Sequence, residues 1–255
     1  MKNLKGKIGL VTGGSRGLGR DMVLRLAENG SDVIFTYHSN ETAAQEVIAS
    51  VEELGQKAVA LQLDQRKVSS FEAFAGGLQE TLNAHTENGK MDFLVTNAGT
   101  GGYNPIGQVA EEQFDDLMQI HFKGVVFLIE HLLPLLDDGG RIINISTGLT
   151  RFVFPGYGPY AAMKGAMEVY TKYLAKELGG RKITANLVAP GAIYTDFNKG
   201  AFDANPQVVE MIGSLTALGR VGQAEDIGGV VAFLASDDAG WINAQRIEVS
   251  GGQNL

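Results

Sequence analysis

Seven short apolar stretches recur along the chain, and the longer stretches between them carry apolar residues at helical spacing. The short stretches are continuous rather than alternating, which is typical of parallel strands buried on both faces. This pattern predicts an α/β fold, a Rossmann-type doubly wound parallel sheet of about seven strands with helices on both faces. We expect strands at 7–12, 32–37, 58–63, 93–97, 141–146, 183–189 and 246–250, and helices at about 18–29, 40–54, 69–87, 111–136, 157–179 and 224–236.

One long segment, residues 191–218, does not continue this alternation of strand and helix. It contains glycines, a proline and scattered apolar residues, and we expect it to be irregular. Segments of this length outside the regular pattern are usually functional or mobile. No linker, repeat or low-complexity tract marks a second domain. We therefore expect a single domain over residues 1–255, in which residues 191–218 form a lid over the substrate.

Composition excludes several classes of function. The chain has 255 residues, no cysteine and a net charge of −8, with no dense run of Lys or Arg. The missing cysteines exclude disulfides and thiolate metal sites, and the negative charge argues against nucleic-acid binding. The apolar runs are too short for a membrane span, and the first is too short for a signal peptide. We expect a cytoplasmic protein with no metal site, no membrane contact and no nucleic-acid partner.

The first predicted strand runs directly into a glycine-rich turn, TGGSRGLGR, at residues 12–20. Gly13, Gly17 and Gly19 allow the backbone to turn sharply and to approach a pyrophosphate closely. The helix that follows offers free N–H groups and the positive end of its dipole. A glycine pattern alone is compatible with a simple tight turn. Its position between the first strand and the first helix favours nucleotide binding.

A second motif, YAAMK, places Tyr160 four residues before Lys164. Residues four apart on a helix lie on the same face, whereas Tyr157, seven residues before the lysine, is about two turns away. A cation close to the Tyr160 phenol favours the phenolate, so we expect its pKa to fall below about 10. Such a phenol can exchange protons near neutral pH. An ordinary amphipathic helix is the alternative interpretation of this motif.

The chain resembles the short-chain dehydrogenase/reductase family along essentially its whole length. The resemblance rests on TGGSRGLG (12–19), NAG (97–99), YAAMK (160–164), NLVAPGAIYTDF (186–197) and residues 218–252. It is strongest to bacterial 3-oxoacyl-carrier-protein reductases and ketoreductases. The resemblance implies a seven-stranded parallel sheet, hydride transfer with a nicotinamide cofactor, and a homotetramer.

The resemblance also assigns roles to residues. It implies that Tyr160 is the general acid/base and that Lys164 binds the nicotinamide ribose. It places Asn97 on the floor of the cofactor cleft and Asp64 near the adenine, although Asp64 is equally compatible with a turn or a helix cap. The full set expected at the cofactor is Gly13, Ser15, Arg16, Gly17, Leu18, Gly19, Tyr37, His38, Ser39, Asp64, Asn97, Ala98, Gly99, Lys164, Pro190, Gly191, Ile193 and Thr195.

Two positions depart from the family pattern. The catalytic serine of the family lies thirteen residues before the tyrosine, where this chain has Thr147, with Ser146 beside it. Either hydroxyl can hydrogen-bond a substrate carbonyl. His121 stands where many relatives have an asparagine that serves a proton relay. A histidine can take that role or merely pack the helix, and a nearby Lys164 would lower its pKa.

The residues at the end of the second predicted strand indicate which nicotinamide cofactor the protein prefers. NAD-preferring relatives carry an acidic residue there, whereas this chain has Tyr37, His38 and Ser39. Arg16 in the glycine turn can bind a 2′-phosphate, or it can be a solvated loop charge. We therefore expect NADPH/NADP+ as the cofactor.

Several aromatic residues lie near the proposed site and in the lid. They favour an apolar substrate pocket, although some of them are also suited to packing loops or a subunit interface. Those expected at the substrate are Phe154, Tyr157, Tyr194, Phe197 and Phe202.

Together these features predict NADPH-dependent reduction of a ketone or aldehyde to an alcohol, with Tyr160 as general acid. An NAD-linked alcohol or sugar dehydrogenase and a non-catalytic nucleotide-binding regulator are the alternatives. Apolar residues spread around two predicted helices are compatible with the homotetramer. They include Val125, Phe127, Met167, Val169 and Tyr173.

Overall fold

The computed structural model describes residues 3–255 and is built around one parallel sheet. Within these residues the sheet has seven strands in the order β3-β2-β1-β4-β5-β6-β7. The predicted doubly wound sheet is thereby confirmed. The strands are β1 (Ile8–Val11), β2 (Asp32–Tyr37), β3 (Ala58–Gln62), β4 (Met91–Thr96), β5 (Leu136–Ile145), β6 (Thr184–Pro190) and β7 (Arg246–Val249).

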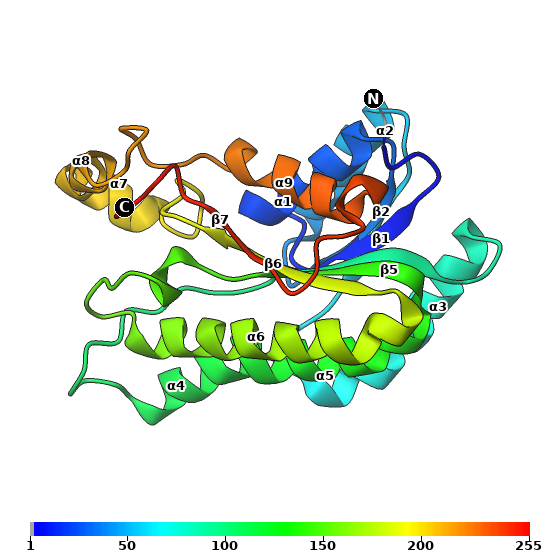
Figure 1. Cartoon of the computed structure of the whole chain (residues 1–255), viewed down its shortest axis with the longest axis horizontal. Coiled ribbons are helices and arrows are strands. Elements are labelled where there is room, and N and C mark those ends of the chain that lie inside the picture. The colour runs from blue at the N-terminus through cyan, green and yellow to red at the C-terminus, as the bar shows by residue number, and fades with distance from the viewer. Residues whose placement is uncertain (1–2) are drawn as a thin grey trace.

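Helices cover both faces of the sheet, as Figure 1 shows. On one side lie α1 (Gly17–Glu28), α2 (Glu41–Glu53) and α9 (Glu225–Ala235). On the other side lie α3 (Phe71–His85), α4 (Glu111–Met118), α5 (Gly124–Leu132) and α6 (Gly158–Glu177).

Two apolar cores, one on each face of the sheet, explain why the strands are continuously apolar. Leu10 and Leu94 pack with the helices α3, α5 and α6. Their neighbours Val11 and Val95 point to the opposite face and pack with α1, α2 and α9. Because successive side chains of a strand point to opposite faces, both must be apolar when both faces are covered.

The helix expected at 111–136 is not continuous. A π-helical turn, Gln119–Lys123, separates α4 from α5, and a short 3₁₀ turn, Leu133–Leu135, leads into β5. The side-chain amide of Gln65 donates to the carbonyl of Ile120 inside the π turn, at 2.8 Å. Gly124 lies so close to the backbone of Gln65 that a Cβ there would be 2.1 Å from its carbonyl oxygen. Wide turns of this kind often lie at functional sites.

The segment expected to be irregular, residues 191–218, contains two short helices. These are α7 (Lys199–Ala204) and α8 (Pro206–Ser214). Phe202 and Ile212 from these helices pack with Val221 in a small apolar cluster separate from the two main cores. The expectation of an irregular segment is therefore wrong, because these apolar residues are spaced to bury one face of each helix.

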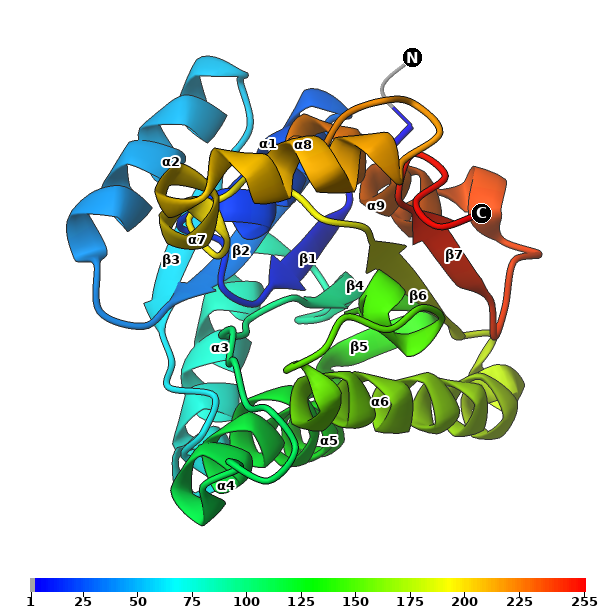
Figure 2. The same cartoon turned by 90° about the vertical axis from the view of Figure 1, so that its left-hand side faces the viewer.

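The carboxyl ends of the strands face the viewer in Figure 2. The helices α7 and α8 lie on one side of this edge, and α4 and the start of α6 lie on the other. The strand order reverses between β1 and β4. In open α/β sheets such a reversal leaves a crevice outside the carboxyl ends, where ligands bind.

Candidate active site

A cleft of about 580 Å³ opens at this reversal point. The glycine turn, the ends of β2, β4, β5 and β6, and residues of α6 and α8 line it. The structure brings together nearly all of the expected site residues there. Lining the cleft are Gly13, Ser15, Arg16, Gly17, Leu18, Gly19, Tyr37, His38, Asp64, Asn97, Ala98, Gly99, His121, Ser146, Thr147, Phe154, Tyr157, Tyr160, Lys164, Pro190, Gly191, Ile193, Thr195, Phe197 and Phe202.

The glycine turn is held in place by β4. The Asn97 side chain donates to the carbonyls of Thr12 and Gly13, at 3.0 and 3.2 Å. A Cβ at Gly19 would lie 2.0 Å from the Gly13 carbonyl oxygen, and Gly13 has a φ of +68°. Only glycine fits these positions without strain. Asn97 therefore fixes the shape of the turn that begins α1.

The first turn of α1 is suited to an anion. Arg16, at the position before the helix, makes no side-chain capping bond with any residue in the described part of the chain. The first turn of α1 itself contains no acidic residue. Uncapped N–H groups at a helix start bind phosphate groups readily.

Tyr160 and Lys164 lie one turn apart on α6, as the motif predicts. The Lys164 ammonium is buried and donates to the carbonyl of Ile145 at 2.7 Å. It lies 6.0 Å from the centre of the Tyr160 ring. Burial lowers the pKa of Lys164 to about 8, because the ammonium loses hydration.

The expected lowering of the Tyr160 pKa is not present in the structure. Burial raises the pKa of Tyr160 to about 12, and a hydrogen bond with Thr147 only partly opposes this. The ring is half-buried and opens onto the cleft. Lys164 does not reverse the effect of burial, because its ammonium is directed at Ile145 rather than at the phenol. The phenol is therefore held in its protonated form at neutral pH.

The two candidate hydroxyls at the end of β5 have different partners. The Thr147 hydroxyl shares a hydrogen bond with Tyr160 and accepts from the Leu149 amide at 3.3 Å. The Ser146 hydroxyl donates to Glu168 Oε1 at 2.8 Å. Both residues line the cleft, and of the two hydroxyls only that of Thr147 lowers the pKa of Tyr160.

His121 lies in the π turn and is directed toward the catalytic motif. Its ring meets the Tyr160 ring edge-on, with centroids 4.9 Å apart, and its Nε2 bonds the Thr100 carbonyl at 2.7 Å. The Nδ1 atom is buried without a hydrogen-bond partner among the described residues. The pKa of His121 falls to about 3, mainly because of burial and secondarily because of Lys164. The ring is therefore neutral at pH 7, and burial contributes more than the like charge that the sequence suggested.

Asp64 lies in the part of the cleft that His38 also lines. It lines the cleft and also closes a local turn, accepting from the Arg66 side chain at 3.0 Å and the Arg66 amide at 3.2 Å. The exposed imidazole of His38 lies 3.7 Å from the Asp64 carboxylate. Arg16 is exposed at the cleft. Ser39 is not one of the described residues that line the cleft, because the chain already turns toward α2 there.

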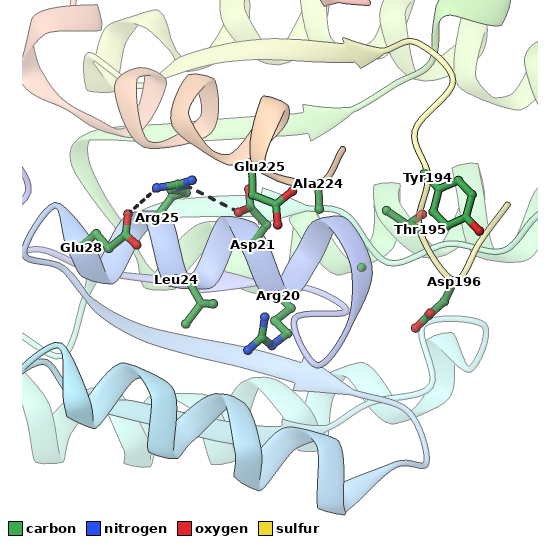
Figure 3. Close-up of a pocket in the computed structure, with 11 residues that line it drawn as sticks. Arg20, Asp21, Leu24, Arg25, Glu28, Tyr194, Thr195, Asp196, Ala224 and Glu225 are labelled. Carbon is green, nitrogen blue, oxygen red and sulfur yellow. Dashed lines mark hydrogen bonds and ion pairs between the residues drawn. The ribbon is translucent and has the colours of Figure 1, made fainter. Parts of the chain in front are cut away.

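Tyr194 also lies outside the cleft lining. It lines a neighbouring pocket between α1, α9 and residues 194–196, which Figure 3 shows. Its hydroxyl is bonded to Asp203, and its ring packs against Phe202 with centroids 5.8 Å apart. Tyr194, which was expected at the substrate, therefore packs against α7 instead of lining the cleft. By contrast, Phe197 lines the cleft, 6.2 Å from Tyr160 between centroids.

Sequence reasoning left out several cleft residues. Gln253 reaches the site from the C-terminal tail and accepts from the Ala192 amide at 2.9 Å. Arg66 also lines the cleft. It lies two residues after Asp64, which was expected there. No short motif points to Gln253, which reaches the cleft only through the path of the chain after β7.

Within residues 3–255, no group of three or more His, Asp or Glu side chains is arranged to bind a metal ion. In the same range, no helix combines the length and the apolar character that crossing a bilayer requires.

Comparison with known proteins identifies relatives along the whole chain. The family model described as "Enoyl-(Acyl carrier protein) reductase" matches residues 13–254. A hydroxynaphthalene reductase-like protein from Metarhizium brunneum is 35% identical over 266 residues, covering 98% of this chain and 96% of the relative. A short-chain type dehydrogenase/reductase from Picea abies is 36% identical over 261 residues, covering 98% of this chain and 93% of the relative.

Two solved structures share the fold closely. The promiscuous reductase LugOII, which catalyses keto-reduction at C1 during lugdunomycin biosynthesis, has a TM-score of 0.93 at 38% identity, covering 99% of this chain and 100% of its own. The angucycline C-6 ketoreductase LanV with bound NADP gives the same TM-score and identity, with coverage of 99% and 97%. With the glycine turn, the Tyr160–Lys164 pair and the sheet order in place, these matches show that the chain belongs to the short-chain dehydrogenase/reductase family of oxidoreductases, close to its ketoreductases.

Proposed function

We propose that this protein reduces a ketone or aldehyde to an alcohol with NADPH, using Tyr160 as the general acid. The observation that carries the proposal is the arrangement of three groups on one wall of the cleft. The Tyr160 phenol is protonated, hydrogen-bonded to Thr147, and one helical turn from the buried ammonium of Lys164. A protonated phenol directed into a cleft can donate a proton to a developing alkoxide.

The cleft fits a nicotinamide dinucleotide. The uncapped start of α1 lies at one end, and the Tyr160–Lys164 pair lies farther along the same cleft. The bound cofactor would supply a hydride. The protein's own residues would do the rest: α1 holds the pyrophosphate, Lys164 holds the ribose, and Thr147 orients the carbonyl oxygen toward Tyr160. We assign the carbonyl contact to Thr147 rather than Ser146, whose hydroxyl is bonded to Glu168.

The proposed preference for NADPH rests on the residues after β2. Tyr37 and His38 line the cleft there, and neither brings a carboxylate that would repel a 2′-phosphate. Exposed Arg16 is placed to bind that phosphate. NADP is bound in the LanV structure, which supports the same preference here.

We propose an apolar, aromatic ketone as the substrate class. Phe152, Phe154 and Phe197 line the cleft near Tyr160, and the α7–α8 segment closes it as a lid. LanV has been solved with NADP and rabelomycin, at 36% identity and a TM-score of 0.90. Flat aromatic substrates suit walls made of aromatic rings.

The direct test is NADPH oxidation, followed by absorbance, with a panel of tetralone, acyl ketones and sugars. We expect tetralone to give the highest kcat/KM and NADPH to give a higher kcat/KM than NADH.

The substitution Arg16→Ala should reduce the preference for NADPH. The control is Arg20→Ala, which should not reduce it, because Arg20 is an exposed residue of the next turn and lines the neighbouring pocket. A higher kcat/KM with NADH would contradict the cofactor assignment. Absence of turnover together with tight NADPH binding would instead favour a regulator.

A further inference from the structure

A polar cluster lies directly behind the catalytic threonine, formed by residues of β5, α6 and β7. Successive residues at the end of β5 are each bonded to one stripe of α6. Ile145 accepts from Lys164, Ser146 donates to Glu168, and Thr147 is bonded to Tyr160. Tyr160, Lys164 and Glu168 are spaced four apart, so they lie on one helical face. Glu168 is therefore the third member of the stripe that carries the catalytic pair.

Arg246 of β7 connects this stripe to the backbone of Thr147. Its Nε donates to Glu168 Oε1 at 2.8 Å, and its Nη2 donates to the carbonyl of Thr147 at 3.1 Å. The Thr150 hydroxyl lies 3.0 Å from the same carbonyl and 2.7 Å from Glu168 Oε1. Arg246 therefore holds the Thr147 carbonyl directly. Thr150 supports it, because its hydroxyl accepts from Arg246 Nη2 at 3.1 Å and donates its single proton either to that carbonyl or to Glu168.

The cluster extends from Arg246 to the C-terminal tail. Glu248 accepts from Arg246 at 3.0 Å and from both nitrogens of the Arg151 fork at 2.6 Å. Arg151 also donates to the carbonyls of Gln253 and Asn254, at 2.6 and 3.0 Å. The Gln253 side chain in turn accepts from the Ala192 amide at the rim of the cleft. Forked contacts of this kind fix direction as well as distance.

We propose that Arg246, Glu168 and Thr150 are positioning residues that set the location of the Thr147 hydroxyl relative to Tyr160. This inference rests on the proposed function, since it assumes that Thr147 orients the substrate carbonyl. None of the three needs to touch the substrate. Their effect arises because a catalytic group displaced by about 1 Å can lose roughly 100-fold in rate. The last strand of the sheet is in this way part of the catalytic apparatus.

The test uses substitutions that remove hydrogen bonds around the Thr147 carbonyl without changing Thr147 itself. Arg246→Met removes the donors but keeps the length of the side chain, and Thr150→Val keeps its shape without the hydroxyl. Thr150→Ser restores the hydroxyl. Arg220→Met is the matched control, because Arg220 makes a forked pair with Asp226 at 2.7 and 2.8 Å and, among the described residues, no hydrogen bond to the cluster behind Thr147. Each variant is measured for kcat and KM with tetralone, for NADPH binding, and for amide hydrogen exchange of residues 147–151.

We expect Arg246→Met and Thr150→Val to lower kcat roughly 10- to 100-fold, the range of a displaced catalytic group. Their NADPH dissociation constants should stay within about threefold, their exchange at residues 147–151 should accelerate, and Thr150→Ser should keep most of the rate. A kcat within about twofold of the parent in both variants would overturn the proposal, as would unchanged exchange. If the parent protein reduces no carbonyl, the proposed function is wrong. The exchange measurement then still decides whether Arg246 and Thr150 stabilise residues 147–151.

Discussion

The hydroxyl that faces Tyr160 belongs to a threonine, and its methyl group restricts the rotation of that side chain. Thr147→Val keeps the volume but removes the hydroxyl, so we expect kcat/KM to fall about 100-fold, as for the loss of a donor to a developing oxyanion. Thr147→Ser should retain most of the activity. Ser146→Ala should cost less than Thr147→Val, because Ser146 is bonded to Glu168. A larger loss in Ser146→Ala would reverse the assignment.

His121 allows a second prediction at the scale of the residue. Its buried, unpartnered Nδ1 can accept a hydrogen bond from a water that leads toward Lys164. His121→Asn should therefore keep kcat within about threefold, whereas His121→Ala should lower it roughly tenfold or more. Because its pKa lies near 3, the parent's pH profile should show no inflection from His121 near pH 6.5.

The competing interpretation of His121 is packing against the Tyr160 ring, 4.9 Å away. Under packing alone, both substitutions would lower the melting temperature and leave kcat nearly unchanged. A kcat for His121→Ala within about twofold of the parent, or under ~0.5 kcal/mol in barrier, would exclude the relay.

The sequence was sufficient to bring Tyr160 and Lys164 together but not to give the directions of the side chains around them. Four-residue spacing places both residues on one face of α6, since helix geometry fixes that relation. The choice between Thr147 and Ser146 depends on which α6 residue each hydroxyl contacts, Tyr160 or Glu168, and no local motif shows this. The pKa of Tyr160 was expected with the wrong sign, because burial is not visible in a local motif.

At the scale of the element, the contact between α1 and α9 contains a buried carboxylate. Asp21 Oδ2 accepts from the Gly228 amide at 3.0 Å, and Arg25 Nε lies 3.6 Å from Asp21 Oδ1. Figure 3 shows the pair of Asp21 and Arg25. Burial raises the pKa of Asp21 to about 6 from an ordinary 3.8. A raised carboxyl pKa stabilises the fold fully below about pH 3.8, and that contribution is lost as the pH rises through about 6.

Asp21→Asn should therefore increase the free energy of unfolding at pH 7.5, by up to about 3 kcal/mol for a shift of about two pKa units. The amide oxygen of Asn can still accept from Gly228. The gain should shrink toward pH 4, where the parent's carboxyl is protonated in the folded state. Urea unfolding at both pH values measures this, with Glu53→Gln, which changes an exposed carboxylate of α2, as the control. Equal or lower stability of Asp21→Asn at pH 7.5 would be inconsistent with a costly buried charge.

The boundaries of helices and strands were predictable where the spacing of apolar residues was regular. The prediction failed where a tertiary contact determines the boundary. The strand at 32–37 agrees with β2 residue for residue. The π turn at Gln119–Lys123 was not predictable, because the Gln65 amide that bonds into it comes from a distant loop. Likewise, α7 and α8 are too short to show a clear helical repeat of apolar residues in the sequence. Their apolar residues Phe202 and Ile212 pack together with Val221, which comes from a later part of the chain.

At the scale of the whole molecule, we propose a homotetramer. Of the residues on α5 and α6 that suggested an interface, Val125 and Met167 are buried within the chain. Phe127, Val169 and Tyr173 are 43%, 55% and 62% exposed, which leaves an apolar outer face on these two helices. Light scattering at micromolar concentration should give the mass of four chains of 27.2 kDa.

Charged substitutions on this outer face should dissociate the assembly, because an unpaired charge in an interface is costly. We expect Val169→Asp with Tyr173→Glu to lower the measured mass, while Lys172→Glu, a change of charge at an exposed neighbour, should have a smaller effect. A monomeric mass for the parent would rule the tetramer out.

The central claim is that Tyr160 donates the proton in carbonyl reduction, and Tyr160→Phe tests it most directly. This substitution removes only the hydroxyl and keeps the ring contacts with His121 and Phe197. The decisive measurement is the single-turnover rate of NADPH oxidation with saturating tetralone. We predict a rate at least about 100-fold below that of the parent, with the NADPH dissociation constant nearly unchanged. A Tyr160→Phe rate within about threefold of the parent would contradict it.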